Sequence, residues 1–132
     1  MQVADYLVKR LEHLGVDRCF MVAGGGAMHL NDALFRSNKI KTIFMHHEQS
    51  CAIAAESFFK VTNRLACICV TSGPGALNAL NGIWGAQADS AGMIILAGQC
   101  RSDHIAEDIN PKLRIFGDQD CPTRAVVTPL ME

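Results

Sequence analysis

The chain has 132 residues, of which 49% are hydrophobic and 19% are charged, and its formal net charge is -1. This balance is typical of a folded domain with its own core, and it excludes an intrinsically disordered chain. Because the charge is near neutral and no basic cluster occurs, the composition argues against a protein that binds nucleic acid or an anionic membrane.

The first fifteen residues predict an amphipathic helix, and not a secretory signal, because apolar side chains recur at helical spacing. These side chains are Val3, Leu7, Leu11 and Leu14. No apolar run approaches the ~20 residues that a membrane span needs. We therefore expect a cytoplasmic protein without a membrane segment, whose six cysteines are reduced thiols.

Short apolar runs and helical patterns alternate along the rest of the chain. The predicted strands cover residues 18–22, 41–45, 65–71 and 93–98, with a fifth over 124–127. The predicted helices cover 29–37, 48–61 and 76–89. Strands rich in Val, Ile and Cys that are each followed by a helix indicate a parallel sheet covered on both faces. The right-handed crossover rule makes this an open, doubly wound α/β domain.

The unusual stretches of the sequence follow the predicted strands, where ligands bind in such sheets. The first is AGGGA (23–27), in which Gly24 and Gly25 allow a backbone to approach a ligand closely. A tight strand-to-helix turn explains the same glycines equally well. The loop lacks the usual dinucleotide-binding register, so it gives only weak support to a flavodoxin-like nucleotide binder.

The second stretch is HHE (46–48), which places Glu48 at the start of a predicted helix. A helix N-terminus favours a carboxylate, so a structural first-turn residue is one interpretation. The small residues that follow make the helix slim, which allows close packing and burial of Glu48. We therefore favour a functional carboxylate. We expect no metal ligands here, because adjacent histidines point apart and no second ligand pair follows.

The third stretch, SGPGALN (72–78), ends a strand with more glycine and proline than a helix start requires. Asn78 is expected to project from the following helix toward the same crevice, although a solvated Asn is the simpler alternative. Gln99, after the fourth strand, either binds a ligand or caps a turn. Small residues leave one face of the 76–89 helix flat, which suits contact within the domain or across a subunit boundary.

Together these stretches carry a resemblance to a known family. The ordered set FMVAGGGAMHLNDAL, HHEQSCAIAAE, VTSGPGALNALNGIWGAQADS and MIILAGQ resembles the N-terminal domain of thiamine-diphosphate-dependent enzymes of the acetolactate synthase type. The match runs from residue 1 to about residue 120. It implies that residues 1–132 form the domain that binds the aminopyrimidine ring of thiamine diphosphate, within a lyase or transferase acting on 2-keto acids.

The resemblance also implies roles for individual residues. A glutamate in the position of Glu48 hydrogen-bonds N1′ of the aminopyrimidine and promotes loss of the proton at the thiazolium C2. Pro74 and Asn78 line the cofactor crevice, and Gly24 and Gly25 approach it from a neighbouring loop. Gln99 lies near the reacting carbon.

Two departures from the family pattern qualify the resemblance. The chain has Val22-Ala23-Gly24-Gly25 where acetolactate synthases usually have Tyr-Pro-Gly-Gly, so the substrate pocket is expected to differ. The Gly-Asp-Gly motif that holds Mg²⁺ and the diphosphate in the family is absent, as is the middle domain that carries FAD in some members. We therefore expect half of an active site, inactive as the isolated chain, which works with a diphosphate-binding domain or subunit in a homo-oligomer.

Two alternatives to a catalytic half-site stay open at this point. One is a non-catalytic binding module that kept the fold, and the other is the flavodoxin-like nucleotide binder. The ends of the chain favour either a piece of a longer enzyme or one subunit of a split enzyme.

Overall fold

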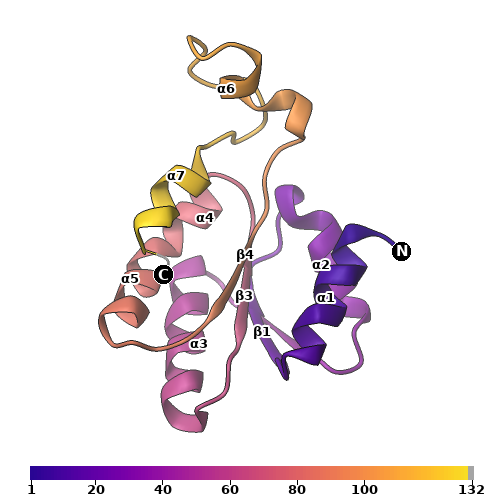
Figure 1. Cartoon of the computed structure of the whole chain (residues 1–132), viewed down its shortest axis with the longest axis vertical. Helices are drawn as coiled ribbons and strands as arrows, with labels where there is room; N and C mark the ends of the chain where they lie inside the picture. Colours follow the sequence, from indigo (N-terminus) through magenta and orange to yellow (C-terminus); the bar gives the residue numbers. More distant parts are fainter. Residues whose placement is uncertain (131–132) are drawn as a thin grey trace.

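Four short parallel strands form the central sheet of the computed structural model, which describes residues 1–130 (Figure 1). They are β1 (Arg18–Met21), β2 (Lys41–Phe44), β3 (Cys67–Val70) and β4 (Ile94–Ala97), in the order β2-β1-β3-β4. In the register of this sheet, Cys19 pairs with Thr42 on one side and with Cys67 on the other. The predicted α/β class and open parallel sheet are confirmed.

Helices cover both faces of the sheet (Figure 1). One face carries α1 (Val3–His13) and α2 (Met28–Arg36), and the other carries α3 (Glu48–Thr62), α4 (Pro74–Asn78) and α5 (Leu80–Ala88). The strand β3 is buried throughout, and its alternating side chains divide between the two cores. Cys67 and Cys69 join the core under α1 and α2, whereas Ile68 and Val70 join the core under α3 and α5.

The buried face of α1 differs from the predicted one. Its buried residues are Ala4, Val8 and Leu11, while Val3 and Leu14 are exposed. Two apolar stripes overlap on this helix and share Leu11, so periodicity alone does not choose between them. Packing against α2 and the sheet selects the stripe that contains the smaller Ala4 and Val8.

The predicted fifth strand over 124–127 is wrong, because this segment is the helix α7 (Thr123–Val127), followed by the 3-10 turn η3 (Thr128–Leu130). A short run with three apolar residues does not distinguish a strand from a helical turn. The predicted helix over 76–89 begins earlier, at Pro74, and is interrupted at Ala79, which separates α4 from α5. Proline is favoured at a first helical position, since it lacks the amide hydrogen that would go unpaired there.

Between β4 and α7 the chain leaves the sheet, which no sequence pattern indicated. Residues 100–120 contain the 3-10 turn η2 (Ser102–His104) and the one-turn helix α6 (Ala106–Ile109). Figure 1 shows this 100–120 segment projecting beyond the carboxyl ends of the strands. Within the described residues, no helix has the length and apolarity needed to span a membrane.

The six cysteines are free thiols in the structure. Cys19 and Cys67 face each other on adjacent strands, and the pKa of Cys19 is raised by its hydrogen bond with Cys67 and by burial. Such thiols stay protonated and serve as small apolar groups in the core.

The strand order places a topological switch between β1 and β3. The chain leaves β1 through α2 on one face and leaves β3 through α4 and α5 on the other face. Since β1 and β3 are adjacent and parallel, the loops that follow them begin side by side. Crevices of this kind, at the carboxyl ends of diverging strands, are where open α/β sheets bind ligands.

The small residues of α3 and α5 face each other within the chain. Ala52 and Ala55 of α3 are fully buried, and Gly82 of α5 lies so close that a Cβ there would be 2.6 Å from the Cβ of Ala52. Of the two uses predicted for the flat face of 76–89, contact within the domain is therefore the one that the structure shows.

We expect Gly82→Ala to destabilise the fold relative to the matched variant Gly85→Ala on the same helix. A Cβ at position 85 would meet only the Glu56 carboxylate at 3.5 Å. Both variants gain the same helix propensity, so the difference between their unfolding free energies isolates the cost of overpacking α3 against α5. We expect this difference to be about 1–3 kcal/mol. Urea unfolding measures it, and equal unfolding free energies would show that the two helices separate without cost.

Candidate functional site

The glycine loop after β1 packs directly on the end of β3. Its residues Gly25–Ala27 form the 3-10 turn η1, and the Gly26 amide donates a hydrogen bond to Thr71 Oγ1 at 3.1 Å. A Cβ at Gly24 would lie 2.4 Å from the Cβ of Thr71, whereas a Cβ at Gly25 would meet nothing within 4 Å. Packing therefore explains Gly24, and Gly25 is left facing open space.

Asn31 of α2 fixes the glycine loop by hydrogen bonds to its backbone. In the amide orientation that satisfies its neighbours, Asn31 accepts a hydrogen bond from the Gly24 amide at 3.2 Å and donates one to the Ala27 carbonyl at 3.3 Å. The loop is thus fixed by side chains from β3 and α2. Neither Thr71 nor Asn31 was singled out by the sequence analysis.

Glu48 is the first residue of α3, and only 8% of it is exposed. The N-cap of the helix is His47, whose Nδ1 accepts a hydrogen bond from the Gln49 amide at 3.2 Å. The capping role therefore belongs to the histidine, and the glutamate is buried beyond what a first-turn residue needs. Within residues 1–130, no cluster of three His, Cys, Asp or Glu side chains is arranged to hold a metal ion.

The Glu48 carboxylate is held from one side and open on the other. Its Oε2 accepts a hydrogen bond from Asn78 Nδ2 at 3.0 Å, while its Oε1 accepts none from the described residues. A Cβ at Gly75 would lie 3.2 Å from this Oε1 and 2.6 Å from Thr71 Cγ2. The missing side chain at position 75 therefore leaves room beside the free carboxylate oxygen.

Cys51 follows Glu48 by one helical turn and faces the core. Burial and, to a smaller extent, the nearby charge of Glu48 together raise the pKa of its thiol to about 12. Its Sγ donates to the His47 carbonyl at 3.6 Å. Cys51 is therefore a protonated structural thiol and not a nucleophile or a metal ligand.

The turn at SGPG depends on Gly73, which has a left-handed φ of 54°. A Cβ at this position would lie 2.4 Å from the Gln119 carbonyl, so the end of the 100–120 segment rests on the turn. Pro74 then starts α4, the five-residue helix that ends at Asn78. The sequence placed Asn78 in the first turn of a longer helix, whereas it ends a short one and points at Glu48.

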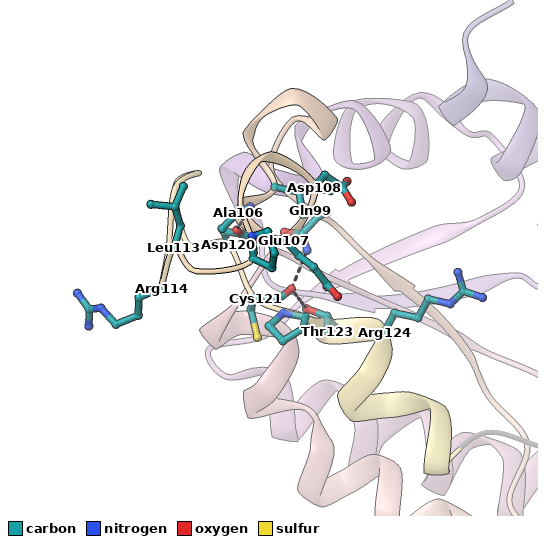
Figure 2. A pocket seen from close by; sticks show the side chains of 13 residues that line it. Gln99, Ala106, Glu107, Asp108, Leu113, Arg114, Asp120, Cys121, Thr123 and Arg124 are labelled. Atoms are coloured by element: carbon teal, nitrogen blue, oxygen red, sulfur yellow. Dashed lines mark hydrogen bonds between the residues drawn. The ribbon is translucent and has the colours of Figure 1, made fainter.

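The Gln99 side chain makes two hydrogen bonds with the backbone. Its Nε2 donates to the Cys121 carbonyl at 2.7 Å, and its Oε1 accepts from the Cys100 amide at 2.9 Å. Gln99 also lines a pocket of about 590 Å³ between the 100–120 segment and α7. Figure 2 shows Arg114 and Arg124 extending away from this pocket on opposite sides. The Gln99 amide thus links the two ends of the 100–120 segment, by hydrogen bonds to the backbone at Cys100 and Cys121.

A cleft of about 780 Å³ lies on the other side of Gln99, against the glycine loop. The residues lining it include Gly24, Gly25, Gly26, Ser72, Gln99 and Gln119. Gly24, Gly25 and Gln99, three of the predicted site residues, thus share one cleft. Glu48 and Asn78 form a separate pair, and Thr71 and Gly75 connect this pair to the glycine loop. Ser72 is a further residue of this cleft that sequence reasoning missed, although it belongs to the SGPG stretch.

Comparison with known proteins gives one family and a set of relatives. Residues 1–118 match the family described as thiamine pyrophosphate enzyme, N-terminal TPP binding domain. The acetolactate synthase large subunit of Haemophilus influenzae is 37% identical over 114 residues, which cover 86% of this chain and 20% of that protein. The chloroplastic acetolactate synthase 2 of Brassica napus is 41% identical over 96 residues, which cover 73% of this chain and 15% of that protein.

A third relative, the chloroplastic acetolactate synthase of Arabidopsis thaliana, is 36% identical over 105 residues, or 80% of this chain and 16% of that protein. In these three comparisons the chain spans between 15% and 20% of the relative's length. The similarity therefore concerns one domain of much longer proteins.

We expect Thr71→Val to loosen the glycine loop, because it removes the oxygen that accepts from the Gly26 amide while keeping the shape of the side chain. Hydrogen exchange of the Gly26 amide, followed by NMR, should accelerate about five- to tenfold, as for the loss of one hydrogen bond. Thr71→Ser keeps the oxygen and serves as the control. If both variants exchange at the wild-type rate, the loop is held by something other than Thr71.

Proposed function

Because the chain belongs to the thiamine pyrophosphate enzyme family, as an N-terminal TPP-binding domain related to acetolactate synthases, we propose that it forms the pyrimidine-binding half of an active site. The complete enzyme is a 2-keto acid decarboxylase or carboligase, a lyase or transferase. In this proposal all 132 residues serve the pyrimidine-binding domain.

The observation that carries the proposal is the buried Glu48 carboxylate with one oxygen held and the other free. Asn78 fixes Oε2, and the absent side chain at Gly75 leaves room beside Oε1. A flat ring that carries a nitrogen at its edge fits such a place, since the ring needs space and its nitrogen needs a partner. The residues present therefore suit the aminopyrimidine of thiamine diphosphate.

Thiamine diphosphate supplies, when bound, the electron sink that decarboxylation of a 2-keto acid requires. The part of this chain is to hold and tune the pyrimidine. Glu48 shares a proton with the ring nitrogen N1′, which a carboxylate does best when water is excluded from it. Asn78 keeps the carboxylate in position, while Pro74, Gly24 and Gly25 contribute to the crevice around the ring.

The Gln99 amide keeps a free donor despite its backbone hydrogen bonds. One N–H of Nε2 is used by the Cys121 carbonyl and one lone pair of Oε1 by the Cys100 amide, so the second N–H is available to orient a substrate near the reacting carbon. We propose this role for Gln99, with the two backbone hydrogen bonds fixing the amide in place.

The rest of the active site comes from a diphosphate-binding domain or subunit, which also carries Mg²⁺. FAD, where the complete enzyme uses it, binds outside this chain. The outer sides of α3, α4 and α5 carry the exposed apolar residues Ile53, Leu77 and Trp84, which favour a partner on this side and assembly as a homo-oligomer. The small-residue faces of α3 and α5 do not serve this purpose, because they are already buried against each other.

The isolated chain should show no 2-keto acid decarboxylase activity and should bind thiamine diphosphate weakly. The charged contacts of Mg²⁺ and the diphosphate supply much of the affinity in this proposal, and they belong to the other domain. Titration calorimetry with Mg²⁺ and the cofactor measures this, and tight stoichiometric binding by the chain alone would contradict the division of the site.

The decisive variant is Glu48→Gln, studied with the partner domain present. Glutamine keeps the size of the side chain and can still hydrogen-bond to Asn78, but it cannot share an acidic proton with N1′. Loss of a general acid/base group typically costs about 10²–10⁴ in rate. Hydrogen–deuterium exchange at the cofactor C2 should therefore slow by such a factor, while cofactor binding stays largely intact.

Glu56→Gln on the same helix is the matched control, because it makes the same chemical change at a side chain that pairs with Lys60. It should leave the C2 exchange rate at the wild-type value. If Glu48→Gln also leaves the rate unchanged, Glu48 is a structural residue, and the non-catalytic binding module becomes the better account.

A further inference from the structure

The Ser72 side chain combines burial with an unused hydroxyl. Only 3% of the residue is exposed, and its hydroxyl makes no side-chain hydrogen bond with another residue in the range 1–130. The hydroxyl oxygen itself is not enclosed, because among the described residues the enclosed side-chain polar atom without a partner is Asp17 Oδ1. Ser72 lines the cleft of about 780 Å³ between the glycine loop and the 100–120 segment, so its hydroxyl is available to a ligand in that cleft.

The backbone around Ser72 is arranged to keep this hydroxyl accessible. A Cβ at Gly26 would lie 2.6 Å from Ser72 Oγ, so any side chain at position 26 would cover it. Opposite the loop, Gln119 adopts a left-handed φ of 55°, which is uncommon for a residue other than glycine. Strained residues of this kind cluster where a ligand is bound.

The lining of the cleft offers several hydrogen-bond donors and one carboxylate. Besides the Ser72 hydroxyl, it presents the imidazoles of His29 and His104 and the guanidinium of Arg101, with Asp118 as the carboxylate in its lining. Arg101 is paired with Asp103 at 2.9 and 2.6 Å, so its charge is largely compensated. Several donors around one cleft suit a small ligand with several acceptor oxygens.

We propose that Ser72 is a substrate-contacting residue, whose hydroxyl donates a hydrogen bond to an oxygen of a small 2-oxo acid in this cleft. The inference rests on the proposed function, because it takes the 2-oxo acid from there. It adds Ser72 as the contacting residue and the turn between β3 and α4 as the place of contact.

The test uses pyruvate as the probe and the amide resonances of the chain as the readout. Sodium pyruvate is titrated against the ¹⁵N-labelled chain, with sodium chloride at equal ionic strength as the reference. We expect saturable shifts at the Gly25, Gly26 and Ser72 amides. Ser72→Ala should weaken the affinity about tenfold, the usual effect of losing a hydrogen bond to a charged acceptor.

Two controls separate contact with the ligand from a role in folding. Ser57→Ala, at an exposed position of α3, should keep the wild-type pyruvate affinity. Ser72→Ala should unfold at the wild-type temperature or above it, because the hydroxyl it removes has no partner to lose. Should this variant fail to fold, Ser72→Cys keeps a side chain of similar shape with a weaker donor and should also bind pyruvate less tightly.

Absence of saturable shifts, or equal pyruvate affinity in Ser72→Ala and the wild type, overturns the inference. This outcome is distinct from failure of the proposed function, which is decided by cofactor C2 exchange in Glu48→Gln. A chain that binds pyruvate through Ser72 while Glu48→Gln exchanges normally would retain the oxo-acid site and lose the catalytic assignment.

Discussion

The crowding of two loops around the Thr71 side chain is the constraint on which the candidate site depends. Because β1 and β3 are adjacent and parallel, the loops that follow them begin at the same edge of the sheet. Thr71 lies between them, in contact range of Gly24 on one side and Gly75 on the other. The glycines are therefore part of one steric arrangement, and each of them is needed because the threonine occupies the shared space.

Burial of Glu48 follows from packing on the other side of the sheet. Small residues along α3 and α5 bring these helices together, and α4 connects the end of β3 to α5 across the start of α3. Asn78 thereby reaches the carboxylate. A bulky α3 would hold α4 and α5 away and leave Glu48 in solvent, so the run of alanines after HHE determines the environment of the carboxylate.

The sequence predicted the sheet and its helices well, because alternating strand and helix patterns are long-range regularities that packing enforces. It also brought together Glu48 and Asn78, since both belong to stretches that follow strands. It misjudged residues 124–127 and the buried face of α1, where a short run or two overlapping stripes left the choice to tertiary contacts. Thr71, Ser72 and Asn31 were missed because their importance lies in neighbours far away in the chain. The irregular 100–120 segment has no periodicity from which its path could have been predicted.

Gly25 stands apart from the other glycines of the site. Packing prevents side chains at Gly24, Gly26 and Gly75, but a side chain at position 25 would enter the cleft without touching the fold. The shape of the cleft can therefore change at this position independently of stability. Position 25 is where natural variation or an engineer could alter ligand preference by a single substitution, leaving the surrounding scaffold as it is.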